Sequence, residues 1–77
     1  MSADEGITGE EWVERFAAEI GIEPPNRQTF GAILKLAATA AHASERTAAP
    51  VACYLAGLTG RRLDELDEIA TRLQGRR

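Results

Sequence analysis

Apolar residues between positions 30 and 41 recur at steps of three and four, and this periodicity restricts the fold more than any other feature of the sequence. Side chains with this spacing share one face of an α-helix. The residues that carry the pattern are Phe30, Ile33, Leu34, Ala37, Ala40 and Ala41. Asn26 precedes them in the position of a helix cap. The segment therefore predicts a long amphipathic helix, and its alanines favour the close approach of a neighbouring helix.

A second helix is predicted nearer the start of the chain. Thr8 and Glu11 have the spacing of a capping box, in which each side chain accepts a hydrogen bond from the backbone of the other residue. Trp12, Phe16 and Ile20 then recur every four residues and form one apolar stripe. Gly21 and the Pro24–Pro25 pair predict the end of this helix and a connector after it.

Two more helices are predicted in the second half of the chain. The segment 44–47 ends or bends the long helix, and Pro50 fits the first turn of a helix that begins at Thr47 or Ala48. Gly57 and Gly60 weaken or close its end, so residues 57–62 are predicted to lie between helices. The last helix carries apolar residues at helical spacing, namely Leu63, Leu66, Ile69, Ala70 and Leu73.

The sequence predicts an all-α fold, a small single-domain helical bundle of about four helices. No alternating strand pattern occurs, and a chain of 77 residues supports one core. Residues 8–75 are predicted to form the domain, with an antiparallel arrangement of helices, and residues 1–7 a flexible leader. The residues expected to be mostly buried are Phe16, Leu34, Ala37, Leu55, Leu66 and Ile69.

Charge and composition exclude several functional classes. The net charge is −3, the only lysine is Lys35, and residues 1–21 carry six acids against one arginine. The electrostatic footprint of a nucleic-acid-binding protein is therefore missing, and no nucleic acid partner is predicted. A single cysteine, the lack of a secretory signal and the lack of a long apolar run predict a soluble cytoplasmic protein outside the membrane.

The segment from His42 to Pro50 is the candidate functional site. His42 and Arg46 are four residues apart and share a helix face if the long helix continues that far, while Thr47 stands at the start of the next helix. These groups could hold a phosphate or carboxylate anion with the free N–H groups of that helix. The structural alternative, which we favour, is that both cations complement the helix dipole and pair with nearby acids.

Catalysis and metal binding find little support in the sequence. One histidine and one cysteine are too few to ligate zinc, so no metal or other cofactor is predicted. Cys53 and His42 are formally a nucleophile and base pair, but Cys53 follows the pattern of a buried apolar residue. Trp12 could be an exposed docking residue, although its stripe favours packing in or near the core.

The order of several short motifs resembles a short actinobacterial helical family of unknown function. The motifs are Glu11-Trp12, Ile20-Gly21-Ile22, Leu34-Lys35-Leu36-Ala37, Ala41-His42, Glu45-Arg46, Ala49-Pro50 and Tyr54-Leu55-Ala56-Gly57-Leu58. The resemblance covers about residues 11–58, and the family often has proline where this chain has Thr47. Such proteins stand alone or are associated with molybdenum cofactor guanylyltransferase-like proteins. The resemblance implies an accessory role near molybdenum cofactor maturation and no catalytic residue.

These observations together predict a non-enzymatic helical module that binds a protein partner or self-associates. The alternative is a small protein that binds an anion or a nucleotide phosphate through His42, Arg46 and Thr47. A hydrolase or transferase that uses Cys53 and His42 is a weaker third hypothesis.

Overall fold

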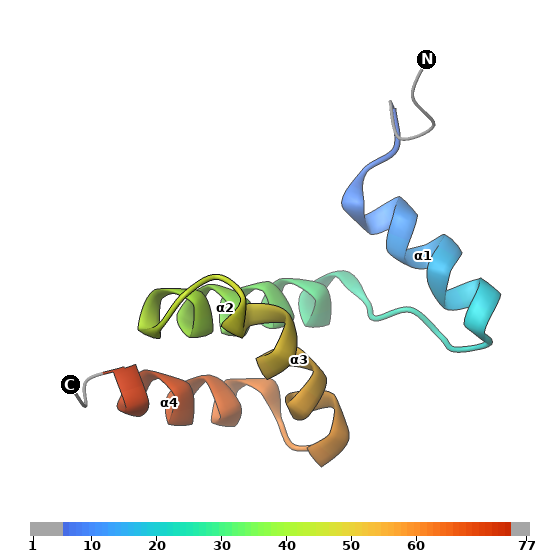
Figure 1. Ribbon diagram of the computed structural model, residues 1–77. Coiled ribbons are helices and arrows are strands. Elements are labelled where there is room, and N and C mark those ends of the chain that lie inside the picture. Colours follow the sequence, from blue (N-terminus) through green and yellow to red (C-terminus); the bar gives the residue numbers. More distant parts are fainter. Residues whose placement is uncertain (1–5, 75–77) are drawn as a thin grey trace.

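The computed structural model describes residues 6–74, which form four α-helices and no strand (Figure 1). The predicted all-α class with about four helices is confirmed. Residues 1–5 of the predicted leader and residue 75 of the predicted domain lie outside the described part of the chain. The helices are α1 (Gly9–Ile20), α2 (Arg27–Ala43), α3 (Ala48–Thr59) and α4 (Leu63–Gln74).

The first two helices begin at the predicted caps. At α1 the Glu11 N–H donates to Thr8 Oγ1 (3.0 Å), and the Thr8 N–H donates to Glu11 Oε1 (3.0 Å), which completes the capping box. At α2 the Thr29 N–H donates to Asn26 Oδ1 over 2.7 Å. Each side chain satisfies a backbone N–H that has no partner inside its helix.

Two glycines in the left-handed conformation end α1 and α3. Gly21 has φ 79° and Gly60 has φ 71°, a region that glycine enters without the steric cost of a Cβ atom. After α1, the Ile22 N–H donates to the Ala17 carbonyl (2.9 Å), as in a Schellman motif. Gly57 instead continues α3, so the prediction that the connector begins at Gly57 is wrong. Two residues separate Gly57 from the C-cap at Gly60, and of these two glycines only Gly60 adopts the left-handed conformation that ends the helix.

The long helix α2 is central, because α3 and α4 both pack against it and contact each other much less. The chain reverses after α2 and again after α3, so α2 and α4 run in the same direction rather than antiparallel (Figure 1). Asp67 of α4 joins this parallel pair: its carboxylate accepts from the Thr39 hydroxyl (2.7 Å) and lies 3.8 Å from Lys35 Nζ. We refer to α2, α3 and α4 as the three-helix unit.

Helix α1 stands apart from the three-helix unit and is connected to it by residues 21–26 (Figure 1). It contacts the other helices much less than α3 and α4 contact α2. The molecule measures 45 × 28 × 19 Å, and its radius of gyration is 14.0 Å. A compact domain of this length has a radius of gyration of about 11 Å, so the projecting α1 lengthens the molecule.

The core is smaller than the sequence predicts. Within residues 6–74 the buried apolar residues are Ala17 and Leu36, and Leu36 is only 3% exposed. The prediction of a buried Phe16, Leu34 and Leu55 is wrong, because each of them is about half exposed. Phe16 lies on the projecting α1, and α2 turns Leu36, rather than Leu34, toward its neighbours. The other predicted core residues are half-buried, namely Ala37, Leu66 and Ile69.

Candidate interaction surface

Helix α3 carries no charged residue, yet much of it lies on the surface. Its twelve residues include no Asp, Glu, Lys, Arg or His. A helix that is apolar on all sides is normally buried, because each exposed apolar side chain costs free energy in water. Here only the side toward α2 is covered. Four large side chains between 55% and 66% exposed form what we call the α3 outer face: Val51, Tyr54, Leu55 and Leu58.

An apolar groove of about 190 Å³ runs between α3 and α4. Leu36 of α2 lies among its lining residues, and the two flanking helices supply the others. We call this hollow the α3–α4 groove. Its residues on α3 are Ala52, Leu55, Ala56 and Thr59, and those on α4 are Leu66, Ile69, Ala70 and Leu73. Leu55 and Leu73 remain 55% and 61% exposed, so the groove is open to an apolar partner.

The apolar stripe of α1 is a second exposed surface. Trp12, Phe16 and Ile20 form this α1 stripe, and their exposed fractions are 52%, 49% and 53%. The two aromatic rings stack on each other with centroids 5.2 Å apart. The expectation that Trp12 packs in or near the core is therefore wrong. The structure instead presents Trp12 as the exposed residue that the sequence left as an alternative.

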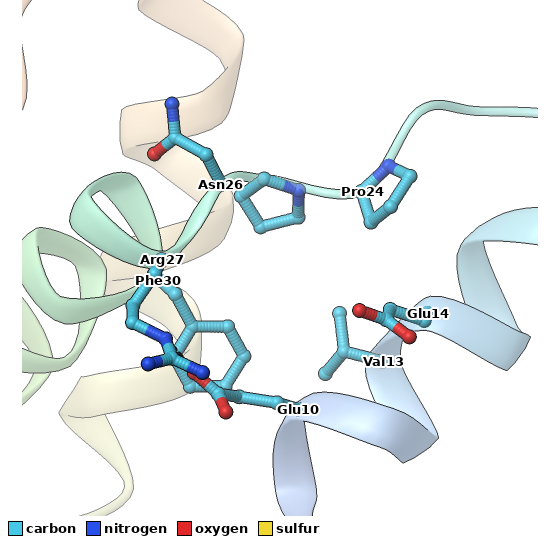
Figure 2. A pocket seen from close by; sticks show the side chains of 8 residues that line it. Glu10, Val13, Glu14, Pro24, Asn26, Arg27 and Phe30 are labelled. Atoms are coloured by element: carbon cyan, nitrogen blue, oxygen red, sulfur yellow. Dashed lines mark ion pairs between the residues drawn. The ribbon is translucent and has the colours of Figure 1, made fainter.

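A small hollow of about 150 Å³ lies where α1 meets the beginning of α2. Figure 2 shows Val13 of α1 and Phe30 of α2 on its two sides, with Arg27 reaching toward Glu10. The Arg27 Nε and Glu10 Oε2 atoms are 3.7 Å apart, and the Arg27 side chain is 89% exposed. An exposed ion pair of this kind contributes about 0–1 kcal/mol. This contact therefore holds α1 weakly.

Cys53 lines a larger cavity of about 530 Å³ between α2, α3 and the start of α4. Its Sγ atom lies 3.9 Å from the Ile33 carbonyl, and partial burial raises the pKa of the thiol. His42 is exposed and lies nine residues beyond Ile33 on α2, about 13 Å along the axis at 1.5 Å per residue. The structure therefore does not bring Cys53 and His42 together as a nucleophile and base.

The three predicted anion-site residues lie at the junction of α2 and α3, and all are exposed. Helix α2 ends at Ala43, so the helical spacing that was expected to align His42 with Arg46 is lost. Thr47 precedes α3, but its hydroxyl does not cap the helix. Within residues 6–74, neither a hydrogen bond nor an ion pair joins any two of these side chains. The anion site stays a prediction.

The two arginines before α4 are paired with acids of its first turn. Arg61 lies 2.6 Å from Glu65, and Arg62 lies 2.7 Å from Asp64. The hydrogen bond from Arg62 lowers the pKa of the Asp64 carboxyl. These cations therefore alternate with acids rather than form a basic patch.

A family model described as a domain of unknown function (DUF6457) matches residues 4–76 of the chain. The chain belongs to the DUF6457 family. The match includes α4, whereas the resemblance seen in the sequence ended near residue 58. Comparison with curated proteins and with solved structures gives no match.

The exposed surfaces of this DUF6457 chain were partly visible in the sequence. Twelve consecutive residues without a charge, from Ala48 to Thr59, already distinguish α3 from the amphipathic α1 and α4. The sequence predicts a buried Leu55 in this segment, whereas the structure leaves it 55% exposed. The α3–α4 groove was not predictable, because it depends on how far α3 and α4 separate while both contact α2.

Proposed function

We propose that this DUF6457 chain is a non-enzymatic protein-interaction module that binds its partner through the α3 outer face and the α3–α4 groove. The observation that carries the proposal is the uncharged α3, whose large apolar residues are more than half exposed. Contiguous apolar surface of this kind on a folded protein marks a binding site for another protein or for a membrane. Among the helices of residues 6–74, none has the length and apolarity to cross a bilayer.

The composition of this surface also suits protein recognition. Tyr54 and Leu58 are each 66% exposed, and tyrosine is among the residues that contribute most to binding energy at protein interfaces. The small residues Ala52, Ala56 and Ala70 line the floor and sides of the groove. Small side chains allow the backbone of a docked helix to approach closely. The surface therefore favours a helical partner with its own apolar stripe.

The resemblance noted in the sequence indicates which proteins to test first. It implies an association with molybdenum cofactor guanylyltransferase-like proteins, so an accessory role in molybdenum cofactor biosynthesis belongs to the proposal. This part of the proposal depends on the resemblance, whereas the binding surface depends on the exposed residues of α3.

Anion or nucleotide-phosphate binding at His42, Arg46 and Thr47 remains the second hypothesis. The first N–H groups of α3 already have partners, because Ala48 donates to the Glu45 carbonyl (2.9 Å) and Ala49 to the Arg46 carbonyl (3.1 Å). Pro50 has no N–H to offer. An anion would therefore depend on the side chains of His42, Arg46 and Thr47 without the N–H groups at the start of α3, and this weakens the hypothesis.

The proposal is tested by affinity capture from extracts of the native cell with three forms of the chain. The wild type and an Ala38→Glu control, altered at an exposed position of α2, should capture the same protein. Leu58→Glu should lose that protein, because binding would bury an unpaired carboxylate. Equal capture by all three forms would exclude the α3 outer face as the binding surface.

A further inference from the structure

The α1 stripe and the α3–α4 groove are complementary surfaces that one chain carries but does not join. The stripe spans Trp12 to Ile20, and the groove residues of α4 span Leu66 to Leu73. At 1.5 Å per residue these lengths are about 12 Å and 10 Å along their helix axes. A helix that presents large apolar side chains and a groove lined by small and branched ones meet the requirements of helix packing.

The connector keeps α1 away from the groove of its own chain. Pro24 and Pro25 fix their own φ angles, and Pro25 also holds Pro24 in an extended conformation. Residues 22–26 are accordingly not helical and hold α1 beyond the N-terminal end of α2 (Figure 1). The exposed pair between Arg27 and Glu10 adds to this arrangement. We propose that α1 instead docks into the α3–α4 groove of a second copy, in a reciprocal dimer.

Charge favours this exchange over a dimer in which the two α1 helices pair. Helix α1 contains four acids and one arginine, a net charge of −3, whereas α3 is uncharged and three of the four acids of α4 are paired with Lys35, Arg61 and Arg62. Pairing two α1 helices would bring like charges together, whereas the groove offers one uncharged helix and one helix whose acids are mostly paired.

The area available also favours two reciprocal contacts over one. A large apolar side chain has about 200 Å² of surface, so the three half-exposed residues of the α1 stripe offer roughly 300 Å². One contact would then bury roughly 600 Å² counting both sides, which is in the range of crystal packing. Two symmetric contacts would bury roughly 1,200 Å², the lower end of the range for stable complexes. Exchange of α1 in both directions therefore reaches an area that a single contact does not.

This inference rests on the proposed function, since it names the partner of the same surface. The first test measures the mass of the full chain by sedimentation at several concentrations, together with acrylamide quenching of its only tryptophan, Trp12. We expect a dimer in which Trp12 is protected, and a monomer with exposed Trp12 on dilution. A monomer with exposed Trp12 at all concentrations would overturn the inference and leave the proposed function standing. A monomer with protected Trp12 would overturn both, because α1 would then cover its own groove.

Variants then identify the two surfaces. Trp12→Glu disrupts the α1 stripe, and Leu55→Glu disrupts the α3–α4 groove. Each variant alone should raise the dimer dissociation constant at least about tenfold, because the dimer would then bury a charge. At high concentration an equimolar mixture should associate more than either variant alone, although more weakly than the wild type, since it restores one intact contact between the α1 of the Leu55→Glu copy and the groove of the Trp12→Glu copy. Ala38→Glu, at an exposed position of α2 outside the groove, is the control and should leave the dimer intact. Circular dichroism verifies that each variant keeps its helices.

The remaining outcomes contradict the exchange. A dimer lost with Tyr54→Glu but kept with Trp12→Glu would show that two α3 outer faces pair. A dimer lost with Trp12→Glu but kept with Leu55→Glu would show that the α1 helices pair. A mixture that associates no more than its two components, even at high concentration, would show that stripe and groove do not meet.

Discussion

Leu34 and Leu36 are two positions apart on α2 and lie in opposite environments. Leu36 is 3% exposed and lines the α3–α4 groove, whereas Leu34 is 57% exposed. Leu36→Ala would leave a cavity where residues of all three helices of the three-helix unit meet. Its expected cost is about 2–5 kcal/mol. Leu34→Ala should cost less than about 1 kcal/mol, because most of that side chain is already in water.

Denaturant unfolding of the two variants measures this difference. The loss of unfolding free energy should be several times larger for Leu36→Ala than for Leu34→Ala. Equal losses would mean that α2 is rotated and that Leu34 shares the core.

Cys53 offers a second prediction at the scale of one residue. Partial burial raises the pKa of its thiol in the folded chain above the value in the unfolded chain. The stabilising effect of the neutral thiol is therefore complete below the unfolded pKa and is lost as pH rises through the folded pKa. The rate of Cys53 alkylation should accordingly rise at a higher pH in the folded chain than in urea. Identical pH profiles in both states would contradict the burial of this thiol.

At the scale of the element, α1 and α3 show two ways in which a short helix leaves apolar surface exposed. Helix α1 is amphipathic, with acids on its polar face, and its stripe remains about half exposed. Helix α3 is apolar on all sides, and α2 covers one of them. The exposure of α1 follows from where the connector directs it. The exposure of α3 follows from its composition, and no rotation of the helix would remove it.

Two glycines at the end of α3 provide a matched test of where this helix stops. Gly57 lies inside the helix, and a Cβ atom built there meets nothing within 4 Å, so Gly57→Ala should stabilise the chain by about 0.5–1 kcal/mol. Gly60 has φ 71°, and a Cβ atom built there also meets nothing within 4 Å. Gly60→Ala should therefore destabilise the chain through its backbone conformation alone, by roughly 1 kcal/mol. The melting temperature should therefore rise for Gly57→Ala and fall for Gly60→Ala. A loss of stability in both variants would place the end of α3 at Gly57.

At the scale of the whole molecule, local signals in the sequence were sufficient for the helices and insufficient for their packing. The caps at Thr8 and Asn26 and the breaks near Gly21 and Ser44 depend on neighbouring residues, and the structure confirms them. The burial of Phe16 and Leu55 was predicted wrongly, because it depends on which helices meet. A periodic stripe shows that a helix has an apolar face, but not whether the partner of that face belongs to the same chain.

The candidate site shows the same limit. An interaction module is predicted by the sequence and stays a proposal, but the residues expected to form a site were those of the α2–α3 junction. His42 and Arg46 share a helix face only if α2 continues to residue 46, and it ends at Ala43. The uncharged α3 was visible in the sequence, yet its exposure could be known only from the arrangement of the three-helix unit.

The central claim is that a single chain exposes the α3 outer face to water and that a protein partner covers it. Hydroxyl-radical footprinting of Leu55 and Leu58 tests it directly, with Leu36 as an internal reference for a buried leucine. In the dilute monomer we expect rapid oxidation of Leu55 and Leu58 and slow oxidation of Leu36, with the first two protected once the partner is bound. Equal protection of all three leucines in the monomer would show that the chain covers α3 by itself, and would contradict the account.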